Sequence, residues 1–417
     1  MKKNYFKKLV TSTMMLLTMT LGFTSCEGTL DDIFGEWSRP VNSKPTEDPM
    51  LSTPLTLEAV NSSETFKLTF SSTLPEATTI EYSANGGSTW STITVPAGTP
   101  GYATGSSWTW VPQVDGTESI SGLSKVMLRA TNEAYGKLVT GLGGFWDPIG
   151  NINIQLDKDC YIYGNVMSLI DKDNFSTLKS FTKDYAFTYL FSGNSHLKNH
   201  GTNNLLLPAT TLKIGSYMNM FSSCSGLTKA PELPATGLTE SCYRGMFDGC
   251  TGLTAAPELP ATTLQKYCYE NMYYGCTSLT AAPELPATTL ADYCYTRMFY
   301  GCTSLTTPPT FPSTAPTLGE GSYYAMFADC TALTASPVIR ATVLTDQCCG
   351  EMFRGCTNLA TITCLATDIS ATGCTNQWVD GVTKTGGTFY KNASMTTWAV
   401  GANGIPDTTP AWTVADF

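Results

Sequence analysis

Histidine is nearly missing from this chain, with only His196 and His200 among 417 residues. Neither lies beside a Ser-x-Gly elbow or a reactive-cysteine motif, and no phosphate loop or dinucleotide fingerprint occurs. No two cysteines have the C-x-x-C spacing typical of zinc sites. These absences predict a protein that is not an enzyme and holds no cofactor or metal. Carboxylate pairs of the glycosidase type have no sequence motif, and these absences do not exclude them.

Charge and long hydrophobic runs are also scarce. Charged residues make up 14% of the chain, and 24 basic against 34 acidic residues give a net charge of −10. The one long apolar run, residues 9–23, follows Lys2, Lys3, Lys7 and Lys8, which is typical of a secretory signal and too short for a membrane span. Removing it leaves 20 basic against 34 acidic residues, a net charge of −14. Such a chain is not expected to bind nucleic acid.

The end of the signal carries a candidate lipid site. Phe23-Thr-Ser-Cys26 resembles a bacterial lipobox, so residues 1–25 are predicted to be a lipoprotein signal peptide and Cys26 the acylated residue. Ordinary cleavage beside an incidental cysteine is the alternative. Acidic residues directly after Cys26 resemble a surface-export signal, which predicts an outer-membrane lipoprotein that faces the cell exterior. Residues 26–50, with three prolines and no periodicity, are predicted to be a flexible tether.

Residues 51–157 have the alternating pattern of β-strands. Phe66, Leu68 and Phe70 alternate with polar residues, and Asn85-Gly86 is a strong hairpin turn. The segment is predicted to be a β-sandwich of the immunoglobulin or fibronectin-III type. Two interpretations of its glycine-flanked tryptophans stay open, an exposed aromatic platform for a glycan or ordinary core and loop packing. The tryptophans concerned are Trp108, Trp110 and Trp146.

A repeat dominates the second half of the chain. Cysteines recur at gaps of 26, 26, 26, 28 and 26 residues, at Cys224, Cys250, Cys276, Cys302, Cys330 and Cys356. Eight residues earlier lies a second column, with Cys242, Cys268, Cys294 and Cys348 and with Ser216 and Ser322 in two units. Four residues before each cysteine of the first column lies a methionine: Met220, Met246, Met272, Met298, Met326 or Met352. A fixed period in the twenties indicates stacked repeats, and these columns are predicted to form the core.

The spacing within one unit predicts a short helix and a short strand. Leu264, Cys268, Met272 and Cys276 step by four, which would place them on one face of a helix. The extended piece after Leu279 ends at a proline, which cannot donate to a sheet ladder. We therefore expect the strands at Pro231, Pro257 and Pro283 to be shortened or bulged.

The unit resembles a known family of repeats. MF-x-G-C-T-x-L-T, followed by L-P-x-T and a tyrosine-rich stretch, is similar to the BspA-type leucine-rich repeats of bacterial surface proteins. The resemblance covers residues 185–374 and implies a strand–helix solenoid. It also implies a surface protein of Gram-negative gut or oral anaerobes that attaches to host matrix or other cells.

Together these patterns predict a multidomain α+β protein. Residues 51–157 would be the sandwich, 158–204 a linker and N-terminal cap, 205–375 the leucine-rich repeats and 376–417 a C-terminal β cap. Asn194 replaces the column cysteine in the predicted cap, where an end repeat must meet water.

The state of the fifteen cysteines and the role of a glutamate row stay open. Cys242 and Cys250 would be about 12 Å apart along a helix, which is too far for a disulfide. This distance favours reduced thiols that pack as small apolar groups. Disulfides between neighbouring repeats are the alternative. Glu232, Glu258 and Glu284 occupy one place in three successive units. They form either a weak calcium site or basic-partner patch, or three solvated side chains. His196 and His200 are four residues apart, as in a zinc pair, but no third ligand stands out and exposed loop histidines are the alternative.

Two functions compete. The first is a non-enzymatic cell-surface lipoprotein that binds a protein or glycan of host or bacterial surfaces through its solenoid. The second is an accessory glycan-binding lipoprotein of a nutrient-capture system. The variable positions Arg244, Glu270 and Thr296 show no common theme that would name the ligand or the binding face.

Overall fold

The computed structural model describes residues 48–100, 102–104, 109–111, 115–138, 149–396 and 398–417. Residues Pro49–Phe417 form one compact unit. Among the described residues, no helix is long and apolar enough to span a bilayer. Cys26, the predicted signal peptide and nearly all of the predicted tether lie outside the described residues.

Residues 49–165, here called the β-domain, contain two antiparallel sheets that contribute to one core. Apolar residues alternate with polar ones in β2 and β10, and Phe70 pairs with Ile154 across them. One sheet has the order β12-β11-β1-β8-β3-β4, the other β7-β2-β10-β9, and β5 pairs only with β6. The strands are β1 (Leu55–Ala59), β2 (Phe66–Ser72), β3 (Thr78–Ser83), β4 (Ser91–Val95), β5 (Tyr102–Thr104), β6 (Thr109–Val111), β7 (Gly116–Leu123), β8 (Lys125–Arg129), β9 (Gly136–Leu138), β10 (Ile149–Leu156) and β11 (Cys160–Asn165).

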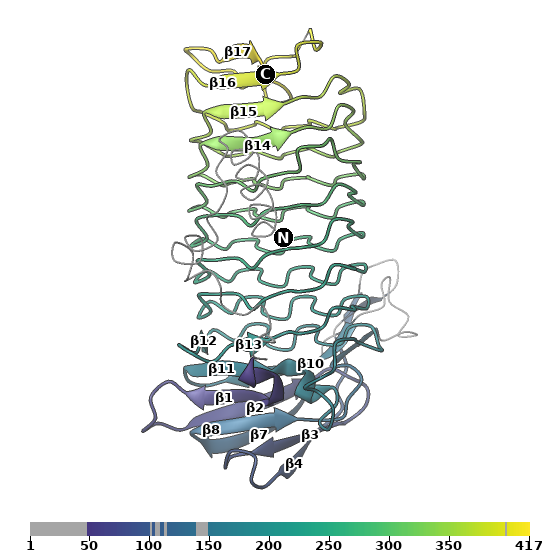
Figure 1. Cartoon of the computed structure of the whole chain (residues 1–417), viewed down its shortest axis with the longest axis vertical. Coiled ribbons are helices and arrows are strands. Elements are labelled where there is room, and N and C mark those ends of the chain that lie inside the picture. The colour runs from purple at the N-terminus through teal and green to yellow at the C-terminus, as the bar shows by residue number, and fades with distance from the viewer. Residues whose placement is uncertain (1–47, 101, 105–108, 112–114, 139–148, 397) are drawn as a thin grey trace, which may run out of the picture. The chain divides into compact units, whose positions relative to one another are not determined.

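Strand β11 joins the β-domain to the repeats through a continuous sheet. It runs antiparallel to β1 on one side and parallel to β12 (Leu197–Asn199) and β13 (Leu205–Leu206) on the other. Buried residues of both regions belong to one hydrophobic cluster. The first repeat is therefore built directly on an edge of the β-domain (Figure 1).

The predicted strand–helix repeat is wrong. The described residues contain no α-helix, and their only helical elements are the short 3-10 helices η1 (Pro49–Ser52) and η2 (Val166–Leu169). Residues 267–275, where the spacing predicted a helix, form a row of consecutive turns. The leucine-rich-repeat solenoid with helices is thus replaced by a stack that is built from turns and strand segments.

The backbone of this turn row explains the four-residue period. Every fourth residue has a left-handed conformation, with φ of 57° at Tyr267, 55° at Asn271 and 65° at Gly275. Left-handed residues cannot continue a right-handed helix. A helix also has 3.6 residues per turn, so side chains four apart drift around its axis, whereas a turn of four residues returns each of them to the same side. Gly275 therefore takes the third left-handed position rather than a helix end.

Backbone hydrogen bonds in the turn row alternate between two directions. We call one repeat of the stack a coil. The N–H groups of Glu270 and Met272 donate to carbonyl groups three residues earlier in the same coil, at 3.2 Å each. Those of Tyr269 and Asn271 donate to carbonyl groups of the next coil, at 3.0 and 2.9 Å. Each coil thus satisfies part of its backbone through its neighbour, which an isolated helix would not do.

Eight coils follow this pattern, two more than the six that were predicted. The turn row of a coil is the nine residues from its first to its last left-handed position. The turn rows are residues 185–193, 215–223, 241–249, 267–275, 293–301, 321–329, 347–355 and 373–381. The first lies inside the segment predicted as linker and cap, and the last extends beyond residue 375. Figure 1 shows the coils stacked from β11 towards β17.

Proline limits the strand side of the stack, as predicted. In the middle coils the strand row is reduced to isolated bridges such as Lys229–Ala255 and Ala281–Thr307. Continuous pairing appears only in the last coils, where β14 (Ala335–Ile339), β15 (Thr361–Cys364), β16 (Thr388–Lys391) and β17 (Thr413–Asp416) form a parallel sheet. The register shifts in β14 between Ala335 and Val338, on either side of Pro337.

Candidate functional site

The predicted repeat columns lie inside the stack. Each of these side chains is fully buried: Cys224, Cys242, Cys250, Cys268, Cys276, Cys294, Cys302, Cys330, Cys348, Cys356, Met220, Met246, Met272, Met298, Met326 and Met352. The fourteen described cysteines are all buried free thiols. These columns therefore support the fold and are not exposed to a ligand.

The main cysteine column has a second role as a ladder of thiol hydrogen bonds. The Cys276 Sγ–H donates to the carbonyl of Phe247 in the preceding coil, at 3.1 Å. Five other thiols make the same bond at 3.0–3.1 Å: those of Cys224, Cys250, Cys302, Cys330 and Cys356. In the first coil the side-chain amide of Asn194 donates to the carbonyl of Ile154 in β10, at 3.2 Å. This hydrogen bond connects the stack to the β-domain.

Sequence reasoning missed two aromatic columns beside the thiols. Tyr217, Tyr243, Tyr269, Tyr295 and Tyr323 stack at ring-centroid distances of 5.7–6.0 Å. A second column stacks at 5.5–5.9 Å and contains Phe191, Phe221, Phe247, Tyr273, Phe299, Phe327 and Phe353. The signal was present, since an aromatic residue follows most column methionines and a tyrosine follows most cysteines of the second column.

The exposed side of the turn rows differs from coil to coil. We call the outward side chains of coils three to seven the turn face; it includes Arg244, Tyr267, Tyr274, Tyr293, Arg297, Tyr300, Tyr324 and Arg354. Three of the six arginines in the chain lie here. Tyr274 and Tyr300 stack at 4.8 Å, and Tyr267 and Tyr293 at 5.5 Å. Each stacked neighbour covers one ring face of its partner.

An ion pair links coils three and four across the turn face. Arg244 Nε lies 2.7 Å from Glu270 Oε2, and the Arg244 guanidinium also lies over the ring of Tyr267, at 5.6 Å. Burial raises the pKa of Glu270, while Arg244 and Arg297 oppose that rise. Thr296 instead donates its hydroxyl to the Gly321 carbonyl, at 2.8 Å. The variable positions Arg244, Glu270 and Thr296 therefore have one property in common, which the sequence does not show: each contacts an adjacent coil.

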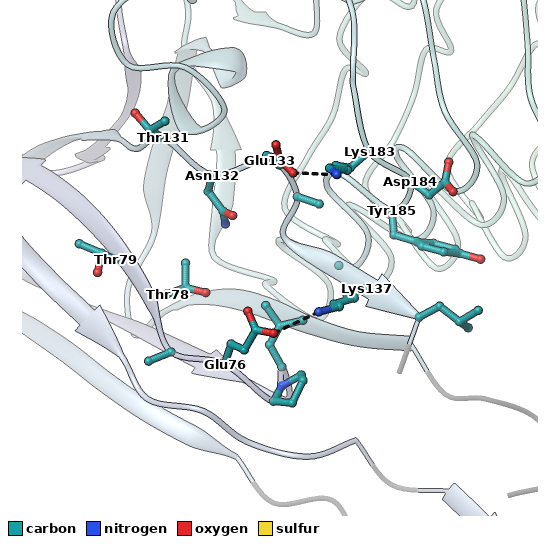
Figure 2. A pocket seen from close by; sticks show the side chains of 16 residues that line it. Glu76, Thr78, Thr79, Thr131, Asn132, Glu133, Lys137, Lys183, Asp184 and Tyr185 are labelled. Atoms are coloured by element: carbon teal, nitrogen blue, oxygen red, sulfur yellow. Dashed lines mark hydrogen bonds and ion pairs between the residues drawn. The ribbon is translucent and has the colours of Figure 1, made fainter. Parts of the chain in front are cut away.

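A second feature is a pocket where the β-domain meets the first coil. This junction pocket has a volume of about 590 Å³ and is lined by the loops before β3 and β9 and by residues 183–185. Lys137 pairs with Glu76, and Lys183 pairs with Glu133, each at 3.2 Å (Figure 2). Figure 2 shows Asn132 and Thr78 on one side of these two pairs and Tyr185 on the other, with its ring pointing away from them. No sequence pattern predicted the junction pocket, because its walls come from separate segments.

The other predicted site residues have simpler surroundings. Glu232, Glu258 and Glu284 are exposed and make no ion pair with any described residue. Trp110 is in β6 but its side chain is not among those described, and Trp108 and Trp146 lie outside the described residues. The described ranges hold no group of three or more His, Cys, Asp or Glu residues that could bind a metal ion.

The two histidines do not point to a common site. His196 Nδ1 lies 2.8 Å from Asp159 Oδ1. His200 Nδ1 instead accepts the backbone N–H groups of Thr202 and Asn203, at 3.1 and 3.0 Å. Each histidine therefore fixes its own loop.

Comparisons with known proteins give no relative: no family model, no curated protein and no solved structure matches the chain.

Proposed function

We propose that this protein is a non-enzymatic surface protein that binds a macromolecular ligand along the turn face. The observation that carries this proposal is the contrast between the two sides of each turn row. The buried side repeats the same cysteine, methionine and aromatic residues, whereas the outward side varies among the coils, apart from the tyrosine pairs that coils four and five share. A constant core can keep the coils in register while the exposed positions are free to match a partner.

The composition of the turn face fits a protein partner better than a glycan. Tyrosine and arginine are enriched at protein–protein contacts, and both are concentrated here. Glycans stack on open ring faces, and a neighbouring ring already takes one face of each of Tyr267, Tyr274, Tyr293 and Tyr300. We therefore propose that ring edges and guanidinium groups contact a protein of the host matrix or of another cell.

The anchor belongs to the same proposal. We propose that Cys26 is acylated and that residues 26–50 tether the compact unit to the outer membrane, facing the exterior. The lipobox-like end of the signal and the proline-containing segment after it support this arrangement.

An array of matrix proteins and surface glycans tests the binding proposal. The protein spanning Pro49–Phe417 is used whole, because β11 pairs with strands of both regions. Its variant Arg297→Ala/Tyr274→Ala should lose a protein signal about tenfold or more, as removal of interface anchors does. The variant Glu232→Gln/Glu258→Gln/Glu284→Gln changes three exposed residues outside the turn face and serves as the matched control.

Two outcomes would contradict the binding proposal. The first is equal binding by the turn-face variant and the parent. The second is a signal for glycans only, which would favour the accessory glycan-binding function instead.

The variant Cys26→Ser tests the anchor in cells. It should leave the membrane fraction or accumulate unprocessed, because no other acyl site is proposed. If it fractionates and migrates like the parent, the lipoprotein proposal is wrong.

A further inference from the structure

The three arginines of the turn face have different surroundings. Arg244 is paired with Glu270, with Nε 2.7 Å from Oε2. Arg354 is paired with Glu351, with Nε 3.0 Å from Oε2. Arg297 is exposed, and within the described residues it has no ion-pair partner. Two of these arginines are thus neutralised within the stack, whereas the third offers an unpaired guanidinium group to solvent.

The unpaired guanidinium belongs to the most tyrosine-rich part of the turn face. Arg297 lies between Tyr293 and Tyr300 along its turn row, and both tyrosines are stacked on those of coil four. Its Cζ is 5.6 Å from the ring centroid of Tyr324 in coil six. Tyrosine and arginine are the side chains that most often anchor protein interfaces. Such surroundings fit a partner group that is anionic and has apolar neighbours.

The backbone of Arg297 gives an independent observation. Its φ is 51°, a left-handed conformation that is unfavourable for a residue with a long side chain. The same place in the three preceding coils is taken by Asn219, Gly245 and Asn271, residue types that adopt this conformation more easily. Arginine therefore costs stability here, and it gains no ion pair in return. Strain of this kind is concentrated at functional positions.

The charges near Arg297 favour one carboxylate over a dense polyanion as its partner. Asp292 directly precedes the turn row of Arg297, and Asp329 ends the turn row of the next coil. The Glu270 carboxylate of the preceding coil is already paired with Arg244. A sulfated or phosphorylated chain would be repelled by these carboxylates while it approached Arg297. A single carboxylate needs only the one unpaired cation.

We propose that Arg297 is the specificity-determining residue of the turn face, and that it binds an aspartate or glutamate side chain of the protein partner. Apolar groups beside that carboxylate contact the neighbouring tyrosine rings. This inference rests on the proposed function, because it names what the partner of the turn face must carry. Arg244 and Arg354 keep their own pairs and hold the coils around Arg297 in place.

Matrix proteins with blocked carboxylates test the assignment. Fibronectin, laminin, fibrinogen and type I collagen are used in two forms, native and amidated at their carboxylates with glycine methyl ester. The protein spanning Pro49–Phe417 should bind at least one native form. Amidation of that form should weaken the binding about tenfold or more. Heparin, a sulfated polyanion, should not compete.

The variant Arg297→Gln completes this comparison. It should weaken binding of the native form to a similar degree, and amidation should then weaken the binding little further, because both changes remove the same contact. Arg340→Gln is the matched control. Arg340 lies outside the turn rows, with its guanidinium 6.0 Å from the Phe417 ring, and its variant should bind like the parent.

A second variant separates recognition from stability. Arg297→Gly introduces the residue that coil three has at this place, so it should unfold at the same temperature as the parent or at a higher one. The same variant should lose binding about tenfold or more. A residue that served only the fold would show the opposite pattern.

Four results would overturn this assignment alone. They are equal binding by the parent and Arg297→Gln, undiminished binding of the amidated partner, competition by heparin, and a clearly lower unfolding temperature of Arg297→Gly. If the parent binds none of the native matrix proteins, the proposed function is wrong and the assignment falls with it.

Discussion

At the scale of single residues, the cysteines act as both packing groups and hydrogen-bond donors. A thiol is small enough for a column in which side chains of neighbouring coils lie in contact, and it still carries one donor. In the last coil Val382 takes the place of the cysteine of this column, and its buried side chain carries no donor. The thiol ladder therefore links coils without any covalent bond.

The first prediction concerns this ladder. Cys276→Ala should lower the free energy of unfolding by about 1–3 kcal/mol, because it removes packed volume and the bond to the Phe247 carbonyl. Cys276→Val keeps the volume and should cost less. Urea unfolding followed by circular dichroism measures both.

Cys268→Ala is the control for that comparison. Cys268 belongs to the second cysteine column and not to the thiol ladder, so its truncation should cost less than that of Cys276. A larger cost for Cys268→Ala would show that the bond between coils contributes nothing.

The second prediction is a thiol count. Protein spanning Pro49–Phe417, prepared without reductant, should show fourteen reactive thiols once unfolded and almost none at pH 8 when folded, because all fourteen are buried. Alkylation followed by mass spectrometry counts them. Four or fewer reactive thiols after unfolding would mean that disulfides hold the coils together.

At the scale of elements, the turn row depends on residues that adopt a left-handed backbone. Glycine does so without strain, whereas other residues pay a steric cost that here is offset by bonds to the next coil. Gly245 shows a second requirement, since a Cβ there would lie 2.0 Å from Asn219 Oδ1 of the preceding coil. Local conformation and coil stacking thus restrict the same positions.

The third prediction distinguishes turns from helices. Gln347 is exposed and has φ of 54°. Gln347→Gly should leave stability unchanged or raise it by up to about 1 kcal/mol, and Gln347→Val should lower it by about 1–2 kcal/mol. Thermal unfolding midpoints give the order. A helix would instead lose about 1 kcal/mol with glycine, so an unstable glycine variant would argue for the helical repeat.

At the scale of the whole compact unit, one core runs from the β-domain to the last coils. Many side chains of this core are thiols and phenols. Their deprotonated, charged forms would be buried away from water, which is unfavourable. Burial raises the pKa of Cys242, Cys250, Cys302, Cys356 and Cys364 to about 12, from an ordinary value of 9.0. Burial also raises the pKa of Tyr217 and Tyr295 above the ordinary 10.0.

The fourth prediction follows for alkaline pH. Above about pH 9 the unfolded chain loses thiol protons that the folded chain keeps, so the folded state is progressively disfavoured up to about pH 12. Each such thiol should remove up to about 1.4 kcal/mol per pH unit within this window. Urea unfolding at pH 8, 9 and 10 measures the change. An unfolding free energy that stays constant from pH 8 to 10 would contradict the burial of these thiols.

The period of the stack, the columns that face its interior and the effect of proline on its strands could all be predicted from the sequence. These features repeat along the chain, so they can be recognised without knowing which distant segments are in contact. Steps of four, as from Cys268 to Met272, fit both a helix and a row of turns, so the local pattern did not distinguish the two. Tertiary structure decided for turns, because the N–H groups of Tyr269 and Asn271 find carbonyl groups only in the next coil. The turn face and the junction pocket depend on it in the same way, since Arg244 meets Glu270, and Glu133 meets Lys183, only once separate segments are packed together.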